Sequence, residues 1–195
     1  ILVQLPLPEH INEKMVIDNI IPIKDVDGFN IQNIGLLTLG EPLVIPCTPL
    51  GCFKILENCV NLEGSDIIII GRSNIVGKPL SYLLTNKNAT VTLAHSKTKN
   101  LKDKCKNYDV VVAAVGIPNL VKEDWLKNES IVIDVGINSI FKDGKRKIVG
   151  DVDFENVISK VKHITPVPGG IGPMTIHCLL NNTYELSVIR NKFNL

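Results

Sequence analysis

Short aliphatic runs alternate along most of the chain with segments whose apolar residues have helical spacing. The clearest run, Ile67 to Ile70, is too short to span a bilayer and ends at a glycine, which predicts a buried strand. Several such runs carry Ile and Val on both faces, as in a parallel sheet covered by helices, and an Asp-Gly pair at 143–144 predicts a hairpin. The pattern indicates a doubly wound α/β fold. The expected strands are residues 66–70, 90–94, 109–115, 130–136 and 163–165, and the expected helices are residues 76–86, 101–107, 122–127, 153–161 and 174–190.

The first 50 residues follow a different pattern. Leu2 to Leu5 are predicted to be extended, and residues 9–17 have the apolar spacing of a short amphipathic helix. Residues 22–49 are rich in glycine, proline and polar residues, which predicts a long loop, and loops of this kind are more often functional than idle. Thr48, which a proline follows, is predicted to be the N-cap of a helix that continues to about Asn58.

Composition narrows the classes of function. The chain has 195 residues, 45% of them hydrophobic, so it can bury the core of one or at most two compact units. Its 21 basic and 20 acidic residues are scattered and give a net charge of +1, so no nucleic-acid surface is expected, and no run suits a membrane segment. Five cysteines without a CxxC pair indicate neither a disulfide framework nor a metal site. A small-molecule ligand and a reducing compartment are expected.

A glycine-containing turn joins the strand at 66–70 to the next helix. It reads Gly71-Arg72-Ser73-Asn74-Ile75-Val76-Gly77-Lys78-Pro79. Free backbone amides at a helix N-terminus attract phosphate, and glycine permits a close approach, so the turn is predicted to bind a cofactor phosphate. Because the spacing is not GxGxxG, an ordinary strand-to-helix turn is the alternative.

The segment after the second predicted strand indicates which dinucleotide fits. An NAD-preferring site usually places Asp or Glu about 20 residues after the glycine turn, where it binds the ribose hydroxyls. This chain has His95-Ser96-Lys97-Thr98-Lys99 there, with hydroxyl groups and positive charge instead of a carboxylate. Together with Arg72, the segment suits the 2′-phosphate of NADP, and a solvated basic loop is the alternative.

Two further segments have the chemistry to face a flat ligand. Thr165 to Thr175 is glycine-rich and leads into a helix, so it can bring bare backbone against a ring, whereas a purely structural turn needs less glycine. Asp25 and Asp27 lie near Phe29, and a carboxylate can bind the amino and ring nitrogens of a pterin. An Asp-Gly turn with a solvated acidic face explains this segment about as well. Gln4, in an otherwise apolar segment, must find a hydrogen bond or face a cavity, and a satisfied core amide is the default interpretation.

Taken in order, these motifs resemble those of the bifunctional methylenetetrahydrofolate dehydrogenase/cyclohydrolase (FolD-like) family. The resemblance spans nearly the whole chain, and so many motifs in the same order argue strongly against coincidence. The matching segments are Leu2–Pro8, Lys24–Phe29, Pro46–Pro49, Gly71–Ser73, Ile75–Pro79, Ala89–Thr92, His95–Ser96, Ile133–Ile137, Gly150–Val152 and Thr165–Thr175.

The resemblance implies an activity and a set of site residues. NADP would accept hydride from 5,10-methylenetetrahydrofolate, and water would open the methenyl product to 10-formyltetrahydrofolate, in the one-carbon metabolism that serves purine biosynthesis. By similarity, the catalytic residues of this chain would be Gln4, which orients a lysine, and Asp27, which anchors the pterin. The residues implied to bind NADP are Gly71, Arg72, Ser73, Ser96, Ile137 and Thr175. Those implied to line the folate pocket are Val3, Gln4, Leu5, Asp27, Pro168, Gly169, Gly170, Ile171 and Gly172.

The resemblance also implies a domain organisation. Residues 47–170 would form a Rossmann-like NADP-binding domain, and residues 1–46 would be the remnant of a second α/β catalytic domain. Residues 171–195 would form a C-terminal helix that returns to the catalytic domain. The homodimer of the family would form through the NADP-binding domain. The expected compartment is the cytoplasm, with the mitochondrial matrix as the alternative.

One family motif does not occur in this sequence. The family's general acid/base is the lysine of a Tyr-x-x-x-Lys motif, whereas the residues four positions after the three tyrosines here are Asn86, Val112 and Val188. Lys24 belongs to a different motif of the family. We therefore expect that the chain begins partway into such an enzyme and that alone it binds NADP but turns over little or no folate. A noncatalytic NADP-binding or dimerisation module is the alternative, and another NADP dehydrogenase on the same fold would leave the pterin-side motifs unexplained.

Overall fold

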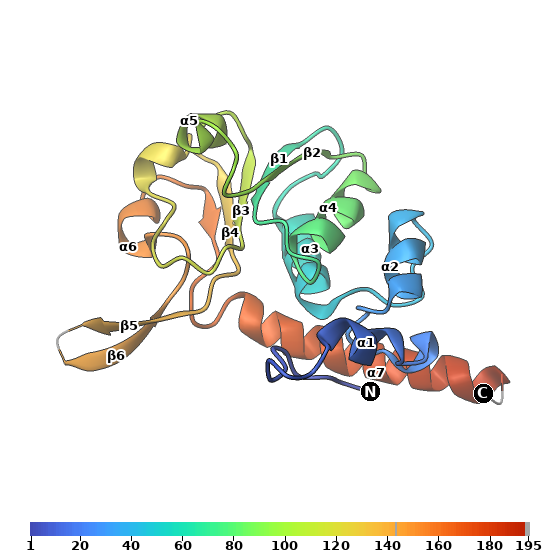
Figure 1. Cartoon of the computed structure of the whole chain (residues 1–195). Coiled ribbons are helices and arrows are strands. Elements are labelled where there is room, and N and C mark those ends of the chain that lie inside the picture. Colours follow the sequence, from blue (N-terminus) through green and yellow to red (C-terminus); the bar gives the residue numbers. More distant parts are fainter. Residues whose placement is uncertain (143, 194–195) are drawn as a thin grey trace.

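A five-stranded parallel sheet forms the centre of the molecule in the computed structural model, which describes residues 1–142 and 144–193. The strand order is β2-β1-β3-β4-β7, and every neighbouring pair is parallel (Figure 1). Ile67 of β1 pairs with Val91 of β2 and with Val110 of β3. The five predicted strands are confirmed. They span Asp66–Ile70 (β1), Thr90–Ala94 (β2), Val110–Ala113 (β3), Ile131–Asp134 (β4) and His163–Ile164 (β7).

Helices cover both faces of the sheet, which explains why β1, β3 and β4 are almost entirely aliphatic. Successive side chains of β1 point to opposite faces, so Ile67 and Ile69 pack with α3 and α4. Ile68 and Ile70 pack instead with α5, η2 and α6 on the other face. All four are at most 1% exposed, and burying each contributes roughly 1.5–3 kcal/mol. The predicted doubly wound fold is confirmed. These helices span Cys47–Cys59 (α3), Gly77–Thr85 (α4), Leu101–Cys105 (α5), Glu123–Trp125 (the 3₁₀ helix η2) and Phe154–Val157 (α6).

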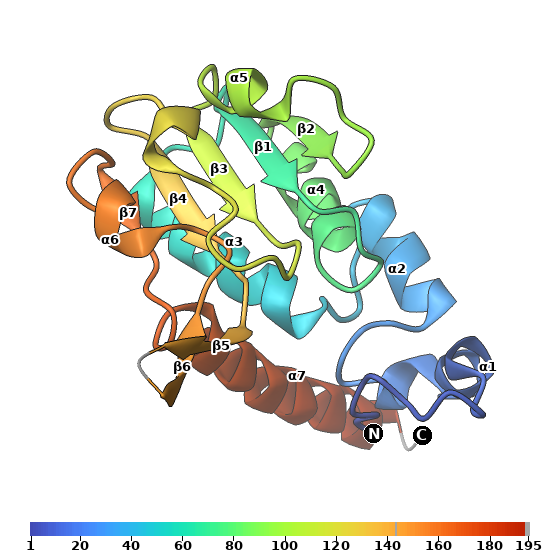
Figure 2. The same cartoon turned by 60° about the vertical axis from the view of Figure 1, so that its left-hand side comes forward.

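The last helix, α7 (Ile171–Phe193), leaves the sheet and returns to the N-terminal residues. Figure 2 shows it running from the carboxyl edge of the sheet toward α1 (Glu13–Asp18). It packs against α3, and its Leu186 is buried together with Val26. Asn182 Nδ2 donates hydrogen bonds to the carbonyl oxygens of Val26 at 3.0 Å and Ile45 at 2.9 Å. The return of the C-terminal helix is thus as expected, while domain boundaries at 46/47 and 170/171 stay a prediction.

The first 46 residues differ most from the sequence-based prediction. Leu2 to Leu5 form no strand. Residues 22–49, predicted to be one loop, contain the 3₁₀ helix η1 (Pro22–Lys24) and the helix α2 (Ile31–Thr38). The loop prediction was wrong because a glycine and polar residues hide the short apolar pattern of α2 in the sequence. In the structure, Leu37 on the apolar face of this helix is fully buried.

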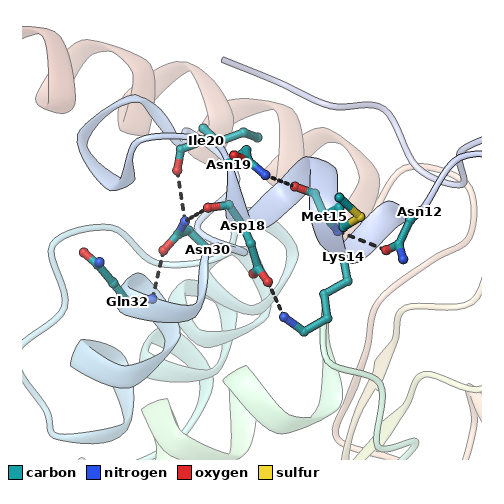
Figure 3. A network of polar contacts seen from close by, with 8 residues as sticks. All are labelled: Asn12, Lys14, Met15, Asp18, Asn19, Ile20, Asn30 and Gln32. Atoms are coloured by element: carbon teal, nitrogen blue, oxygen red, sulfur yellow. Dashed lines mark hydrogen bonds and ion pairs between the residues drawn. The ribbon is translucent and has the colours of Figure 1, made fainter.

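Asparagine side chains cap the N-termini of the first two α-helices, α1 and α2 (Figure 3). The helix α1 (Glu13–Asp18) follows Asn12, whose Oδ1 accepts a hydrogen bond from Met15 N at 3.0 Å, so this helix is shorter than predicted. At the start of α2, Asn30 Oδ1 accepts from Gln32 N at 2.9 Å, while Asn30 Nδ2 donates to Ile20 O at 2.9 Å. Such caps satisfy amides that have no partner within the helix and contribute about 1 kcal/mol each. Asn30 therefore also connects α2 to the segment that follows α1.

Two local predictions had different outcomes. The helix α3 begins at Cys47, so the prediction that Thr48 is its N-cap was wrong; the Thr48 hydroxyl instead lies 3.1 Å from that of Thr175. The hairpin is confirmed, because β5 (Asn138–Lys142) pairs antiparallel with β6 (Lys145–Val149). Of its predicted Asp-Gly turn, Asp143 lies outside the described residues.

Candidate functional site

An apolar cavity of about 810 Å³ lies at the carboxyl edge of the sheet. The fold brings four segments to its wall: the start of α3, the turn before α4, the residues after β4 and the first turns of α7. Doubly wound sheets bind their ligands at this edge, outside the carboxyl ends of the strands. The lining includes Val76, Val135, Ile137, Ile171, Gly172 and Thr175.

Residues of two expected groups meet in this cavity. Ile137 and Thr175 were expected on the cofactor side, and Ile171 and Gly172 on the folate side. Ile137 is 72% exposed, although it is a large aliphatic residue. Exposed apolar surface at a concave edge is typical of a ligand site. The sequence therefore predicted four residues that the structure places on one cavity.

The turn after β1 brings backbone segments into direct contact. Gly71 has a φ of +127°, and a Cβ there would lie 2.1 Å from the carbonyl oxygen of Ala114. A Cβ at Gly77 would lie 2.0 Å from the carbonyl oxygen of Gly71. Both distances are far below van der Waals contact, so both positions require glycine. The chain thus makes the tight strand-to-helix turn that a phosphate-binding loop needs.

Ser73 binds two backbone amides at the start of α4. Its Oγ accepts hydrogen bonds from Val76 N at 3.1 Å and from Gly77 N at 3.4 Å. The expectation that the amides at this helix N-terminus are free was therefore wrong for these two. Because the oxygen accepts both bonds, the hydroxyl proton of Ser73 points elsewhere and can be donated to an anion.

The end of β2 lies beside the glycine turn. Gly71 N donates a hydrogen bond to Ala94 O, the last residue of β2, at 2.9 Å. Arg72 and Ser96, which follow these two strands, are both exposed. Residues 95–99 contain no carboxylate, so this corner of the edge presents a guanidinium and hydroxyl groups to solvent.

The glycine-rich segment Thr165–Thr175 contributes to the cavity only through its last residues, which form the first turns of α7. Ile171 and Gly172 line it, whereas residues 168–170 are not part of the lining. A Cβ at Gly170 would lie 2.6 Å from the carbonyl oxygen of Pro166, so the backbone requires glycine there. A Cβ at Gly172 would meet no atom within 4 Å. Gly172 therefore leaves space for a ligand.

Asp27 lies outside the lining of this cavity, in a loop fixed by Asp25. The buried Asp25 carboxylate accepts hydrogen bonds from Gly28 N at 3.0 Å and Asn30 N at 2.7 Å. Burial first, and then the negative charge of Asp25, raise the pKa of Asp27 to about 6. Cys47 Sγ lies 3.8 Å from Asp27 Oδ1, and burial raises the pKa of that thiol to about 12, so it is a neutral donor. Asp27 is therefore a half-buried carboxyl group that can gain or lose a proton near neutral pH.

The segment 3–5 lies beside the Asp27 loop and does not line the cavity. Val26 N donates a hydrogen bond to Ile1 O at 3.4 Å, which places the start of the chain next to this loop. Val3 and Leu5 are half-buried. Gln4 is exposed, and its Nε2 donates to Leu5 O at 3.5 Å, so the interpretation of Gln4 as a core amide was wrong.

The structure adds two buried carboxylates that the sequence-based site lacked. Asp134 ends β4, and Asp151 follows the hairpin; both are at most 2% exposed and accept backbone hydrogen bonds at the carboxyl edge. An acidic residue at the end of an aliphatic strand is the sequence feature that could have identified Asp134, because buried carboxylates need partners.

Neither a metal-binding cluster nor a membrane-spanning helix is found in the described ranges 1–142 and 144–193. No three or more His, Cys, Asp or Glu residues there gather closely enough to bind a metal ion. No helix in the same ranges combines the length and apolar character needed to cross a membrane.

The glycine turn after β1 and the apolar cavity at the carboxyl edge are the features of nucleotide-binding α/β domains. Comparison with known families agrees with this class. The chain belongs to the tetrahydrofolate dehydrogenase/cyclohydrolase NAD(P)-binding domain family, whose model matches residues 46–191.

Three relatives illustrate the likeness. The chain is 54% identical over 193 residues to the bifunctional protein FolD 1/3 of Ruegeria pomeroyi, covering 98% of this chain and 65% of the relative. It superposes with a TM-score of 0.91 on the bifunctional FolD methylenetetrahydrofolate dehydrogenase/cyclohydrolase of Campylobacter jejuni, at 50% identity over 96% of this chain and 66% of the other. It superposes with a TM-score of 0.89 on the Trypanosoma brucei enzyme, which was solved with NADP and an inhibitor. The identity is 39%, over 94% of this chain and 64% of the other. The chain thus spans just under two thirds of the length of each relative.

Proposed function

We propose that this chain supplies the nucleotide-binding and folate-facing part of an NADP-dependent methylenetetrahydrofolate dehydrogenase and methenyltetrahydrofolate cyclohydrolase. The observation that carries the proposal is the meeting of Ile137 and Thr175 with Ile171 and Gly172 around one apolar cavity. Membership of the family and the activity named for the Campylobacter jejuni relative support it.

The residues at the carboxyl edge fit NADP. Gly71 and Gly77 allow the close backbone packing of the turn, and the Ser73 hydroxyl has a proton to donate to a phosphate. Arg72 and Ser96 are exposed where a 2′-phosphate would need cationic and hydroxyl partners. NADP, when bound, supplies the acceptor for the hydride of 5,10-methylenetetrahydrofolate. The structure of the Trypanosoma brucei relative with NADP supports this choice of cofactor.

On the folate side, Asp27 binds the amino and ring nitrogens of the pterin through its carboxyl oxygens. Asp25 fixes the loop that carries Asp27, and Ile171 with Gly172 forms an apolar wall for the ring. Gln4 is exposed, so its amide is available to orient a catalytic lysine.

The family suggests the wider setting of this function. We include in the proposal a homodimer that forms through the nucleotide-binding domain, a role in the one-carbon supply to purine biosynthesis, and a cytoplasmic location. All five cysteines are free, which agrees with a reducing compartment.

A chimera tests the proposed activity. The present chain replaces the matching 66% of the Campylobacter jejuni enzyme, and reduction of NADP by 5,10-methylenetetrahydrofolate is followed at the absorbance of the reduced nicotinamide. We expect turnover by the chimera, loss of turnover in its Asp27→Ala variant, and no change in its Glu9→Ala variant, in which the carboxylate removed is on the surface. A folded chimera that binds NADP without turnover would contradict the proposal and favour a noncatalytic binding module.

A further inference from the structure

Two buried carboxylates adjoin the segment that carries the cavity residues Val135 and Ile137, and the proposed reaction does not use them. Asp134 is 2% exposed and Asp151 is 0% exposed. Burying a carboxylate costs several kcal/mol unless hydrogen bonds compensate for the lost water. Both carboxylates have such bonds, and two of the donors, Gly136 and Asn138, flank the cavity residue Ile137.

Asp151 connects the end of β3 to the start of β5. Its Oδ2 accepts hydrogen bonds from Val115 N at 2.7 Å and Gly116 N at 3.0 Å. Its Oδ1 accepts from Ile117 N at 2.9 Å and from Asn138 Nδ2 at 2.8 Å. Asn138 directly follows the cavity residue Ile137, so Asp151 fixes the chain on the C-terminal side of Ile137.

Asp134 fixes the chain on the N-terminal side of the same residue. Its Oδ1 accepts hydrogen bonds from Gly136 N and from Asp151 N, both at 2.9 Å, and its Oδ2 accepts from Val152 N at 2.9 Å. The backbone amide of Asp134 donates to Thr165 Oγ1 at 2.8 Å. The two carboxylates thus hold the backbone on both sides of Ile137 in one network that also reaches the glycine-rich segment before α7.

No side chain separates these carboxylates from the backbone. A Cβ at Gly136 would lie 2.3 Å from Asp151 Oδ1, and a Cβ at Gly150 would lie 1.8 Å from Asp134 Oδ2. Backbone and carboxylates are therefore in direct contact at both glycines. A shift of either carboxylate must move the backbone that presents Ile137, because interiors packed at this density transmit strain.

We propose that Asp151 is a positioning residue for the nicotinamide half of NADP, acting through Asn138 and the amides of residues 115–117 on the orientation of Ile137. This inference rests on the proposed NADP site. A dinucleotide lies across the strand ends of a doubly wound sheet, with its adenosine half at the first two strands. Arg72 and Ser96 lie at that end, whereas Ile137 follows β4. Asp151 therefore affects one half of the cofactor and not the other.

Calorimetric titration of this chain with two ligands separates positioning from a general structural role. NADP contains both halves of the cofactor, whereas 2′,5′-ADP contains only the adenosine half with its phosphates. We expect Asp151→Asn to weaken NADP binding by about 10- to 100-fold, as loss of partners behind a binding site typically does, and to change 2′,5′-ADP binding by less than about twofold. The matched control is Asp124→Asn, the same change at a surface carboxylate paired with Lys102, which should alter neither affinity.

Asn138→Ala serves as a second variant, since it removes only one of the four hydrogen bonds that the Asp151 carboxylate accepts and keeps that carboxylate. It should show the same selective loss of NADP affinity in a smaller degree, even if Asp151→Asn does not fold. Equal weakening of both ligands in a folded variant, or unchanged NADP binding in both variants, would overturn the inference. A wild-type chain that binds neither ligand would instead overturn the proposed function itself.

Discussion

The hydroxyl groups of Thr48 and Thr175 lie 3.1 Å apart, although the two residues are separated by 127 positions in the chain. Thr175 Oγ1 also donates a hydrogen bond to Ile171 O at 3.0 Å, so Thr48 supplies the proton of the shared bond. Both residues line the cavity. This bond therefore joins α3 to α7 at the wall of the candidate site.

The bond predicts energetic coupling between the two helices. Thr48→Val and Thr175→Val should each destabilise the chain by about 1–2 kcal/mol. The double variant should lose roughly 1 kcal/mol less than the sum of the two single variants, because the second change removes a group that already lacks its partner. Urea unfolding of the four proteins measures the coupling. The same cycle with Thr38→Val, whose hydroxyl bonds only within its own helix, should be additive. Additivity for Thr48 and Thr175 would show that their contact does not contribute to stability.

Asp27 predicts a dependence of stability on pH. Its pKa is raised from 3.8 to about 6, first by burial and then by the charge of Asp25, so between these values the folded state binds more protons than the unfolded state. The free energy of unfolding should therefore fall as pH rises from about 4 to about 6 and change little from this group above that range. The full shift corresponds to roughly 3 kcal/mol, which solvent screening at this half-buried site reduces to about 1–2 kcal/mol.

Asp27→Asn isolates this contribution, because the amide does not titrate. Urea unfolding at several pH values should give a flatter profile for the variant than for the wild-type chain between pH 4 and pH 6. Glu9→Gln, at an exposed surface position, should keep the wild-type profile. Identical profiles for Asp27→Asn and wild type would mean that the burial of Asp27 does not perturb its proton affinity.

Arg72 predicts the preference between the two nicotinamide dinucleotides. Arg72→Gln should weaken NADP binding by about 10- to 100-fold, the equivalent of roughly 1.5–3 kcal/mol for hydrogen bonds to a charged group, and leave NAD binding almost unchanged. Calorimetric titration with both dinucleotides measures the preference. Arg146→Gln, the same change on the exposed hairpin, should leave both affinities as they are. An equal loss for NADP and NAD would show that Arg72 does not contact the 2′-phosphate.

Gly170, just before α7, and Gly172, in its first turn, predict opposite effects of the same substitution. Gly170→Ala should destabilise the chain by about 2–4 kcal/mol, because its Cβ would lie 2.6 Å from Pro166 O. Gly172→Ala should leave stability unchanged or raise it by up to about 1 kcal/mol, since Gly172 lies in a helix with open space around it. Its methyl group would occupy ligand space in the cavity, so ligand binding should weaken in this stable variant. Thermal unfolding combined with titration distinguishes the two positions, and a destabilised Gly172→Ala would contradict the assignment of that space to a ligand.

The strands of the sheet were predictable because burial on both faces leaves a repeated aliphatic run in the sequence, as in Ile67 to Ile70. The helix α2 was not, because its stability depends on the Asn30 cap and on burial of Leu37, neither of which makes a periodic pattern in so short a segment. The actual partner of Thr48 could not be inferred either, since it lies on α7 and only the fold brings the two together.

The residues of the candidate site likewise fall into those that the sequence could predict and those that it could not. The need for glycine at Gly71 could be predicted from the strand-to-helix turn alone, and the family motifs indicated Ile137, which the structure places on the cavity. The network of Asp134 and Asp151 could not be predicted, because its donors are mostly backbone amides from separate loops that carry no distinctive side chain.

Titration of the 195-residue chain with NADP and with NAD tests the central claim most directly, because that claim assigns the carboxyl-edge cavity to a nicotinamide dinucleotide. The account predicts saturable binding of NADP at one site per chain and clearly weaker binding of NAD. Absence of saturable binding for both, or tighter binding of NAD than of NADP, would contradict it.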